Sequence, residues 1–132
     1  MLHLAVERFD YWTELSGRHL DLTDPDVVRV NAIDLRHAQR IRAGYGPDVT
    51  VLLDVEVVID TDGSRARRRF AELVRRPGVS YAGTPAGLAG LIADIHAAGV
   101  ADGVTLLPKD EQSMEHIAQH TVPWLESRYI AS

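Results

Sequence analysis

Residues 79–108, VSYAGTPAGLAGLIADIHAAGVADGVTLLP, contain the most clearly marked helix of the chain. Thr84 is the expected N-cap, because its hydroxyl can accept a hydrogen bond from a free amide of the first turn. Pro85 falls at the first helical position, where its missing N–H costs nothing. Gly99 is placed to end the helix in a left-handed conformation. An Asp-Gly turn and a short buried strand at residues 104–107 follow, so the stretch predicts turn, helix, turn and strand.

The strongest strand is predicted at residues 49–59, which are rich in β-branched side chains. Alternation along a strand places its odd-numbered apolar residues on one face and Asp54 and Glu56 on the other, roughly 7 Å apart. Two carboxylates in different environments can divide acid and base roles. Asp54 and Glu56 are therefore the candidate catalytic pair, and an ordinary solvent-facing strand surface is the alternative interpretation.

The N-terminal residues 2–20 permit two interpretations. Val6, Phe9 and Trp12 are spaced to line one face of a helix that ends at Gly17, whereas a strand at 2–6 followed by a helix fits nearly as well. The aromatic side chains then belong either to the core or to an exposed patch for a partner.

The other elements complete an alternating pattern. A strand at 27–30 precedes a helix at 34–43, and a helix at 64–76 is expected to bury Ala66, Phe70, Leu73 and Val74. A last helix begins after its N-cap Asp110 and is expected to kink or break near residues 120–122, because Pro123 lies inside its pattern. Such alternation implies a parallel sheet with right-handed crossovers.

Composition limits the class of protein. With 132 residues, 45% hydrophobic and 25% charged, residues 1–132 are expected to form a single soluble domain. The net charge of −5 disfavours a nucleic-acid partner, and the absence of cysteine excludes disulfides and thiol chemistry. No apolar run reaches the roughly 18 residues of a membrane span. The N-terminus lacks the features of a signal peptide, so a cytoplasmic protein is expected.

Order and spacing add a family resemblance. Tyr81-Ala-Gly-Thr-Pro85, a helix ending at Gly99, and Ala101-Asp-Gly-Val-Thr-Leu-Leu-Pro108 resemble the C-terminal part of bacterial luciferase-like flavin-dependent monooxygenases. In that family a Gly-Thr-Pro turn opens the penultimate helix, and an Asp-Gly turn leads into the last strand of a (βα)8 barrel. The resemblance extends more weakly over residues 25–128.

A complete barrel takes about 250 residues, roughly twice this length. The resemblance therefore implies an α/β fold that is a partial, TIM-barrel-like (βα)8 structure, with three to four parallel strands and helices packed on them. It implies a luciferase-like flavin-dependent monooxygenase or oxidoreductase module, truncated and in doubt as an independent catalyst. The implied cofactor is FMN, with F420 as the alternative. The implied partners are a small organic substrate, molecular oxygen with FMN, and a flavin reductase or a second barrel half.

Two other functions remain open. One is a non-catalytic flavin-binding or dimerising module derived from the same family. The edges and the exposed face of an open sheet favour a homodimer as the simplest cover. The other is a stand-alone small α/β enzyme that uses Asp54 and Glu56.

Cofactor contacts are expected at the carboxyl ends of the strands, where barrels of this type place their sites. Asn31 follows one predicted strand and Lys109 follows another, so both are candidate flavin contacts. Gly83 and Thr84 lie at a helix N-terminus, where free amides and the dipole favour an anion such as a flavin phosphate. Plain helix capping is the alternative for this pair.

No metal site is expected. His116 and His120 are spaced i, i+4 as metal-binding pairs can be, but Ile117 stands where the zinc protease signature requires glutamate.

Overall fold

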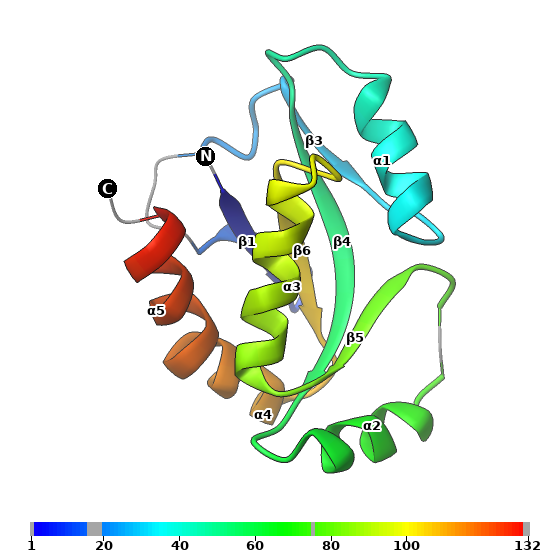
Figure 1. Cartoon of the computed structure of the whole chain (residues 1–132), viewed down its shortest axis with the longest axis vertical. Coiled ribbons are helices and arrows are strands. Elements are labelled where there is room, and N and C mark those ends of the chain that lie inside the picture. Colours follow the sequence, from blue (N-terminus) through cyan, green and yellow to red (C-terminus); the bar gives the residue numbers. More distant parts are fainter. Residues whose placement is uncertain (1, 16–19, 75, 131–132) are drawn as a thin grey trace.

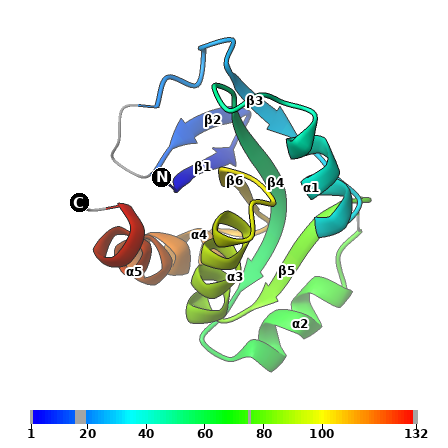
Figure 2. The same cartoon turned by 45° about the horizontal axis from the view of Figure 1, so that its top comes forward.

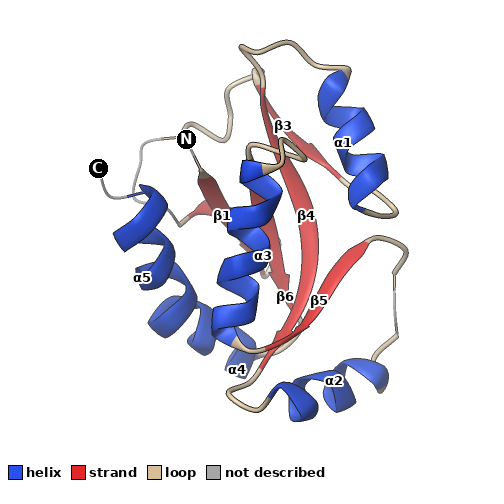
Figure 3. Cartoon of the chain, viewed as in Figure 1, coloured by secondary structure: helices blue, strands red, loops and turns tan. Residues whose placement is uncertain are grey.

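The computed structural model describes residues 2–15, 20–74 and 76–130, which form an α/β fold around one curled sheet (Figure 1, Figure 3). Within these residues six strands form the sheet in the order β2–β1–β6–β4–β3, and β5 also pairs with β4. The strands are β1 His3–Arg8, β2 Tyr11–Glu14, β3 Val27–Val30, β4 Thr50–Ile59, β5 Val79–Gly83 and β6 Gly103–Pro108.

The sheet is mixed, and it has more strands than the three to four parallel ones expected. β1, β3, β4, β5 and β6 run parallel, while β2 runs antiparallel to β1. Along one edge of β4, residues 50–53 pair with β3 and residues 55–59 pair with β5, and β6 pairs along the other edge. β6 therefore lies between β4 and β1, whereas a closed barrel would place it beside β5.

The N-terminal segment corrects the expectation of a helix. Leu4 and Val6 belong to the apolar core and the equally buried Ala5 does not, which is the two-residue period of a strand, and β1 pairs with β6 along this stretch. Phe9 and Asp10 have φ angles of 50° and 68° and connect β1 to β2. The alternative with a strand at the start was right for β1, but β2 replaces the helix that this alternative placed after the strand. Gly17, the expected helix end, lies outside the described residues.

The helices begin where their caps were expected. They are α1 Leu35–Ala43, α2 Gly63–Ala71, α3 Pro85–Ala97, α4 Glu111–His116 and α5 Val122–Leu125, with π-helical turns at Ile117–Thr121 and Glu126–Ile130. Asp34, Thr84 and Asp110 each accept a hydrogen bond from a backbone amide three residues on. Gly99 has φ 69°, as expected of a residue that ends a helix. None of the helices in the described parts of the chain combines the length and the apolar character needed to cross a lipid bilayer.

The break expected near Pro123 takes the form of the π-helical turn Ile117–Thr121. Within it Thr121 is buried, and its hydroxyl donates to the carbonyl oxygen of Pro85 at 3.1 Å. This bond ties the last helical segment to the first turn of α3.

Two predictions around residues 64–83 were wrong. α2 ends at Ala71 instead of reaching residue 76, so Val74 is 90% exposed and Leu73 is also exposed. A proline disfavours helical geometry in the residue before it, and Pro77 follows closely. Residues 79–83, expected as a turn, form β5, which is only five residues long and depends on its pairing with β4.

The apolar core lies between one face of the sheet and the helices that cross it. Figure 2 shows α3 and α5 on the same side of the sheet. The odd-numbered residues of β4 and the even-numbered residues of β1 and β6 supply the sheet side of this core, and α3 supplies Leu88, Ala89, Ile92 and Ile95. The parity predicted for β4 is confirmed, since Leu53, Val55, Val57 and Ile59 belong to this core whereas Leu52 and Val58, although buried, do not.

This packing predicts a large difference between two truncations. Ile92→Ala is expected to lower the free energy of unfolding by about 2–5 kcal/mol, because it leaves a cavity in the core. Val74→Ala removes only exposed methyl groups and should change it by less than about 0.5 kcal/mol. Urea unfolding followed by circular dichroism measures both. Equal effects would contradict the assignment of the core face.

Candidate functional site

The face of the sheet opposite α3 carries a network of charged side chains. Asp54 pairs in register with Thr105, and Arg29 with Leu52, so alternation places Arg29, Asp54 and Thr105 on this face. Arg29 donates from Nε to Asp54 Oδ1 at 2.6 Å and from Nη1 to Glu7 Oε1 at 2.8 Å. One guanidinium thus joins β1, β3 and β4.

Trp12 closes the network from β2. Its Nε1 donates to Thr105 Oγ1 at 3.0 Å, and its ring centroid lies 5.7 Å from the Arg29 guanidinium carbon. Thr105, Leu52 and Val58 are also buried, although they do not belong to the apolar core on the α3 side. The inner face of the sheet is therefore filled largely by its own side chains.

The two carboxylates that share Arg29 have pKa values shifted in opposite directions. Burial raises the pKa of Asp54, and this effect outweighs the hydrogen bond and the charge of Arg29, while the charge of Glu7 raises it further. The hydrogen bond from Arg29 is the main reason why the pKa of Glu7 is lowered. Asp54 therefore holds its proton more tightly than an ordinary aspartate, whereas Glu7 holds its proton less tightly than an ordinary glutamate.

Glu56 lies in a different environment from Asp54. Its Oε2 is 3.4 Å from Lys109 Nζ, and both side chains are mostly buried. The expected carboxylate pair is thus present on one face, with one member paired to an arginine and the other to a lysine.

Two pockets open beside this network. The larger, which we call the hairpin pocket, has a volume of about 300 Å³ and lies at the carboxyl ends of β1 and β6; its lining residues are Glu7, Arg8, Phe9, Asp10, Pro108, Lys109, Asp110 and Glu111. The smaller, the carboxylate pocket, has a volume of about 60 Å³ and is lined by Asn31, Asp54, Glu56, Arg76, Pro77, Gly78, Val79 and Leu107.

The structure brings four of the six candidate site residues together. Asn31, Asp54 and Glu56 line the carboxylate pocket, and the ion pair from Glu56 to Lys109 leads into the hairpin pocket. Gly78 borders the same region in a backbone conformation with φ 151°, and a Cβ added there would lie 2.9 Å from Asn31 Oδ1. Glycine is needed at this position for the close approach.

Gly83 and Thr84 line neither pocket. Thr84 Oγ1 accepts from the Gly87 amide at 3.1 Å, which is the capping role. A Cβ added at Gly83 would meet the Tyr81 hydroxyl at 2.4 Å. The first turn of α3 is therefore packed against the protein's own atoms.

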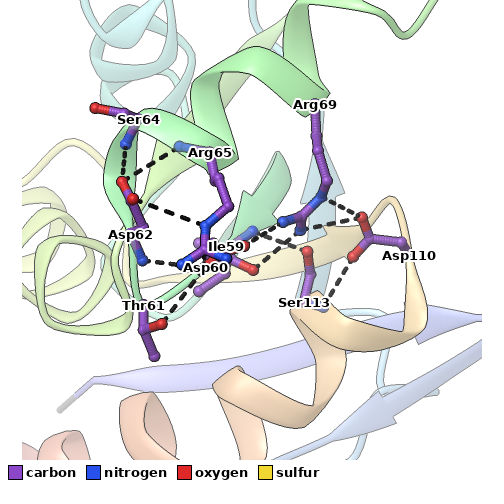
Figure 4. Close-up of polar contacts among 9 residues, drawn as sticks. All are labelled: Ile59, Asp60, Thr61, Asp62, Ser64, Arg65, Arg69, Asp110 and Ser113. Atoms are coloured by element: carbon purple, nitrogen blue, oxygen red, sulfur yellow. Dashed lines mark hydrogen bonds and ion pairs between the residues drawn. The ribbon is translucent and has the colours of Figure 1, made fainter.

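A second polar network, not anticipated from the sequence, joins the segments that follow β4 and β6 (Figure 4). Asp60 is only 3% exposed, and its Oδ2 accepts from Arg69 Nη1 at 2.6 Å. The same guanidinium donates to the carbonyl oxygen of Ile59 at 3.2 Å and to Asp110 Oδ2 at 3.3 Å. Ser113, one turn into α4, accepts from the Ile59 amide at 2.8 Å.

Both acids of this network are stabilised as anions. A hydrogen bond from the Asp62 amide, then the charges of Arg65 and Arg69, hold the pKa of Asp60 below its usual value against the effect of burial. Burial alone would raise the pKa of Asp110, but hydrogen bonds from Ser113 and the charge of Arg69 lower it overall. Because Asp110 directly follows Lys109, this network fixes the chain that carries Lys109.

His116 and His120 stack with ring centroids 6.0 Å apart. Among the residues that the structure describes, no group of three or more histidine, aspartate or glutamate side chains is placed to hold a metal ion.

Comparison with solved structures identifies proteins of similar fold. EDTA monooxygenase (EmoA) from Chelativorans sp. BNC1 matches with a TM-score of 0.64 at 15% identity over 80% of this chain and 40% of that one. Long-chain alkane monooxygenase (LadA) matches with a TM-score of 0.61 at 12% identity, over 78% of this chain and 37% of that one. Riboflavin lyase (RcaE), solved with modified FMN and riboflavin, matches with 0.61 at 13% identity over 81% and 40%.

These neighbours are bacterial luciferase-like flavin monooxygenases, so the expected resemblance is confirmed at the level of fold. The chain spans about 40% of the length of each. No protein-family model and no curated protein sequence matches it.

The Arg69 network predicts a pH-dependent loss of stability. Arg69→Met is expected to cost about 1.5–3 kcal/mol at neutral pH, because the buried Asp60 carboxylate loses its hydrogen bond from Arg69 and keeps only the Asp62 amide and the more distant Arg65. The pKa of Asp60 is lower in the native state than in the unfolded state. The stability that the charged Asp60 contributes is therefore complete above the ordinary aspartate pKa of about 3.9 and is lost as the pH falls through the native pKa. Urea unfolding at several pH values between neutral pH and a pH of about 3 should show that the free energies of unfolding of the wild type and Arg69→Met approach each other as the pH falls.

Arg68→Met is the matched control, since Arg68 is the exposed neighbour on the same helix. It should change stability by less than about 0.5 kcal/mol. A cost for Arg69→Met that does not vary with pH would contradict a role through Asp60.

Proposed function

We propose that this chain is a luciferase-like flavin-dependent monooxygenase or oxidoreductase module. The observation that carries the proposal is the position of the two pockets. They lie at the carboxyl ends and along the inner face of parallel strands, in a fold shared with flavin-dependent monooxygenases. Folds of this kind place their active sites at the carboxyl ends of strands. We also propose that the curled sheet corresponds to part of a (βα)8 barrel.

The residues present fit the ring system of a flavin. The hairpin pocket, at about 300 Å³, lies at the lower end of the range of about 300–1,000 Å³ for small-molecule sites. Its lining offers the aromatic ring of Phe9 and the cationic groups of Arg8 and Lys109, which suit a planar, electron-rich ligand. A bound flavin would supply the redox chemistry, while the protein orients it.

The candidate residues then take distinct roles. Lys109 and Asn31 would hold the polar edges of the cofactor. Asp54, whose pKa is raised, would hold a proton for donation, and Glu56 would accept one. We retain Gly83 and Thr84 as proposed phosphate contacts, because β5 ends at Gly83 and its carboxyl end lies at the same end of the sheet as that of β4. FMN is the proposed cofactor and F420 the alternative.

Turnover by this chain alone is not part of the proposal. Because the chain spans about 40% of its neighbours, a second barrel half or a flavin reductase would complete the system.

The proposal predicts saturable flavin binding. Titration of the protein with FMN and with F420, followed by flavin fluorescence, should show binding at micromolar flavin. Lys109→Met should weaken it by about tenfold or more, because hydrogen bonds to charged groups contribute about 1.5–3 kcal/mol. Arg67→Met, which removes an exposed charge on α2, is the matched control and should bind normally. No binding of either flavin up to millimolar concentration would overturn the proposal.

A dimerising module is the second candidate, favoured by the open edge of β2. Within the described sheet β2 pairs only with β1, and Tyr11 on this strand is 75% exposed. Unprotected edge strands pair with further strands unless they are covered.

This second candidate predicts a homodimer in solution. Sedimentation at micromolar protein should give the mass of a dimer, and Tyr11→Lys should give a monomer, because lysine on an edge strand opposes pairing. A wild-type protein that is strictly monomeric would exclude it.

A further inference from the structure

The turn between β1 and β2 is strained. Phe9 and Asp10 are the residues other than glycine that adopt positive φ angles in the described part of the chain, at 50° and 68°. Two-residue hairpin turns of this geometry favour Asn-Gly, because a Cβ crowds the backbone when φ is positive. A phenylalanine in the first position is therefore unfavourable for folding. Strained residues persist where the surrounding structure holds them and often lie at binding sites.

Core packing does not explain the choice of Phe9. The residue is 79% exposed and belongs to no part of the apolar core. Its ring lines the hairpin pocket, and the guanidinium carbon of Arg8 lies 4.8 Å from the ring centroid. The turn thus presents an aromatic face and a cation side by side at the carboxyl end of β1.

The cations of this pocket are held by partners that a ligand can replace. Arg8 pairs with Glu111 of α4, whose side chain is 65% exposed, so solvent screens the pair and weakens it. Lys109, on the opposite wall, pairs with Glu56 at 3.4 Å. Glu7, Asp10 and Asp110 also line the pocket, so an anionic group would have to take the place of Glu111 on Arg8 while a flat ring covers Phe9.

We propose that Phe9 and Arg8 form a binding surface for a planar aromatic anion, with the ring stacked on Phe9 and the anionic group on Arg8. This inference rests on the proposed function for the location of the site, and it adds the anionic group of the ligand and the separate parts that Phe9 and Arg8 take in binding.

The test uses 2-naphthoate, a planar aromatic anion that is not a flavin. Titration into isotope-labelled protein should shift the amide resonances of residues 8–11 and 109–111. Phe9→Asn should raise the melting temperature, because asparagine tolerates the turn. It should also weaken the binding of 2-naphthoate by about tenfold, which is the scale expected for the loss of an aromatic stacking partner. Phe9→Trp should restore binding without the gain in stability.

Two controls separate stacking from turn geometry. Asp10→Gly relieves strain at the next position and keeps the ring, so the melting temperature should rise with no loss of affinity. Tyr45→Ala removes an exposed aromatic ring beyond the end of α1 and should change neither quantity. A Phe9→Asn variant that binds as tightly as the wild type would overturn the proposal. A Phe9→Asn variant that changes the mass found by sedimentation, but not the affinity for 2-naphthoate, would also overturn it.

Failure of this inference differs from failure of the proposed function. Flavin binding without any effect of Phe9→Asn, and with no shifts at residues 8–11, would remove the Phe9–Arg8 surface and leave the flavin proposal standing. Binding of 2-naphthoate at residues 8–11 in a protein that binds no flavin would remove the flavin proposal and leave the Phe9–Arg8 surface standing.

Discussion

The hydrogen-bonded ladder of β4 is the constraint on which the rest of the molecule depends. This strand of ten residues holds β6 along one edge, and β3 and β5 in succession along the other. Its alternation assigns each side chain to the apolar core under α3 or to the polar inner face. A one-residue shift in pairing would exchange the two faces, so the core and the candidate site depend on the same register.

Local signals were enough to predict the elements that carry them. β4 and β6 are rich in β-branched and apolar residues, and α3 has a cap, a proline and a terminal glycine in the right order. The elements that were missed depend on distant partners. β2 and β5 are short and are stabilised by their pairing with β1 and β4. Their sequences carry too little periodicity to reveal this.

The candidate site shows the same division. Strand parity placed Asp54 and Glu56 on one face, and the position of Lys109 after a strand brought it near them. Arg29 was missed, because its role requires β1, β3 and β4 to lie together. Alternation within a strand indicates a face, but it does not indicate which residue of another strand lies opposite.

The filled inner face of the sheet determines how a ligand can be held. Trp12, Arg29 and Thr105 contact one another on the inner face, and the larger of the two pockets lies at the carboxyl ends of β1 and β6, so a ligand would sit at the rim. The rim groups Phe9 and Glu111 are largely in contact with water. Oxygenation chemistry needs water kept out, and without that protection reducing equivalents are spent without product. A catalyst built on this chain would therefore spend most of its reducing equivalents without forming product unless a second polypeptide covered the rim.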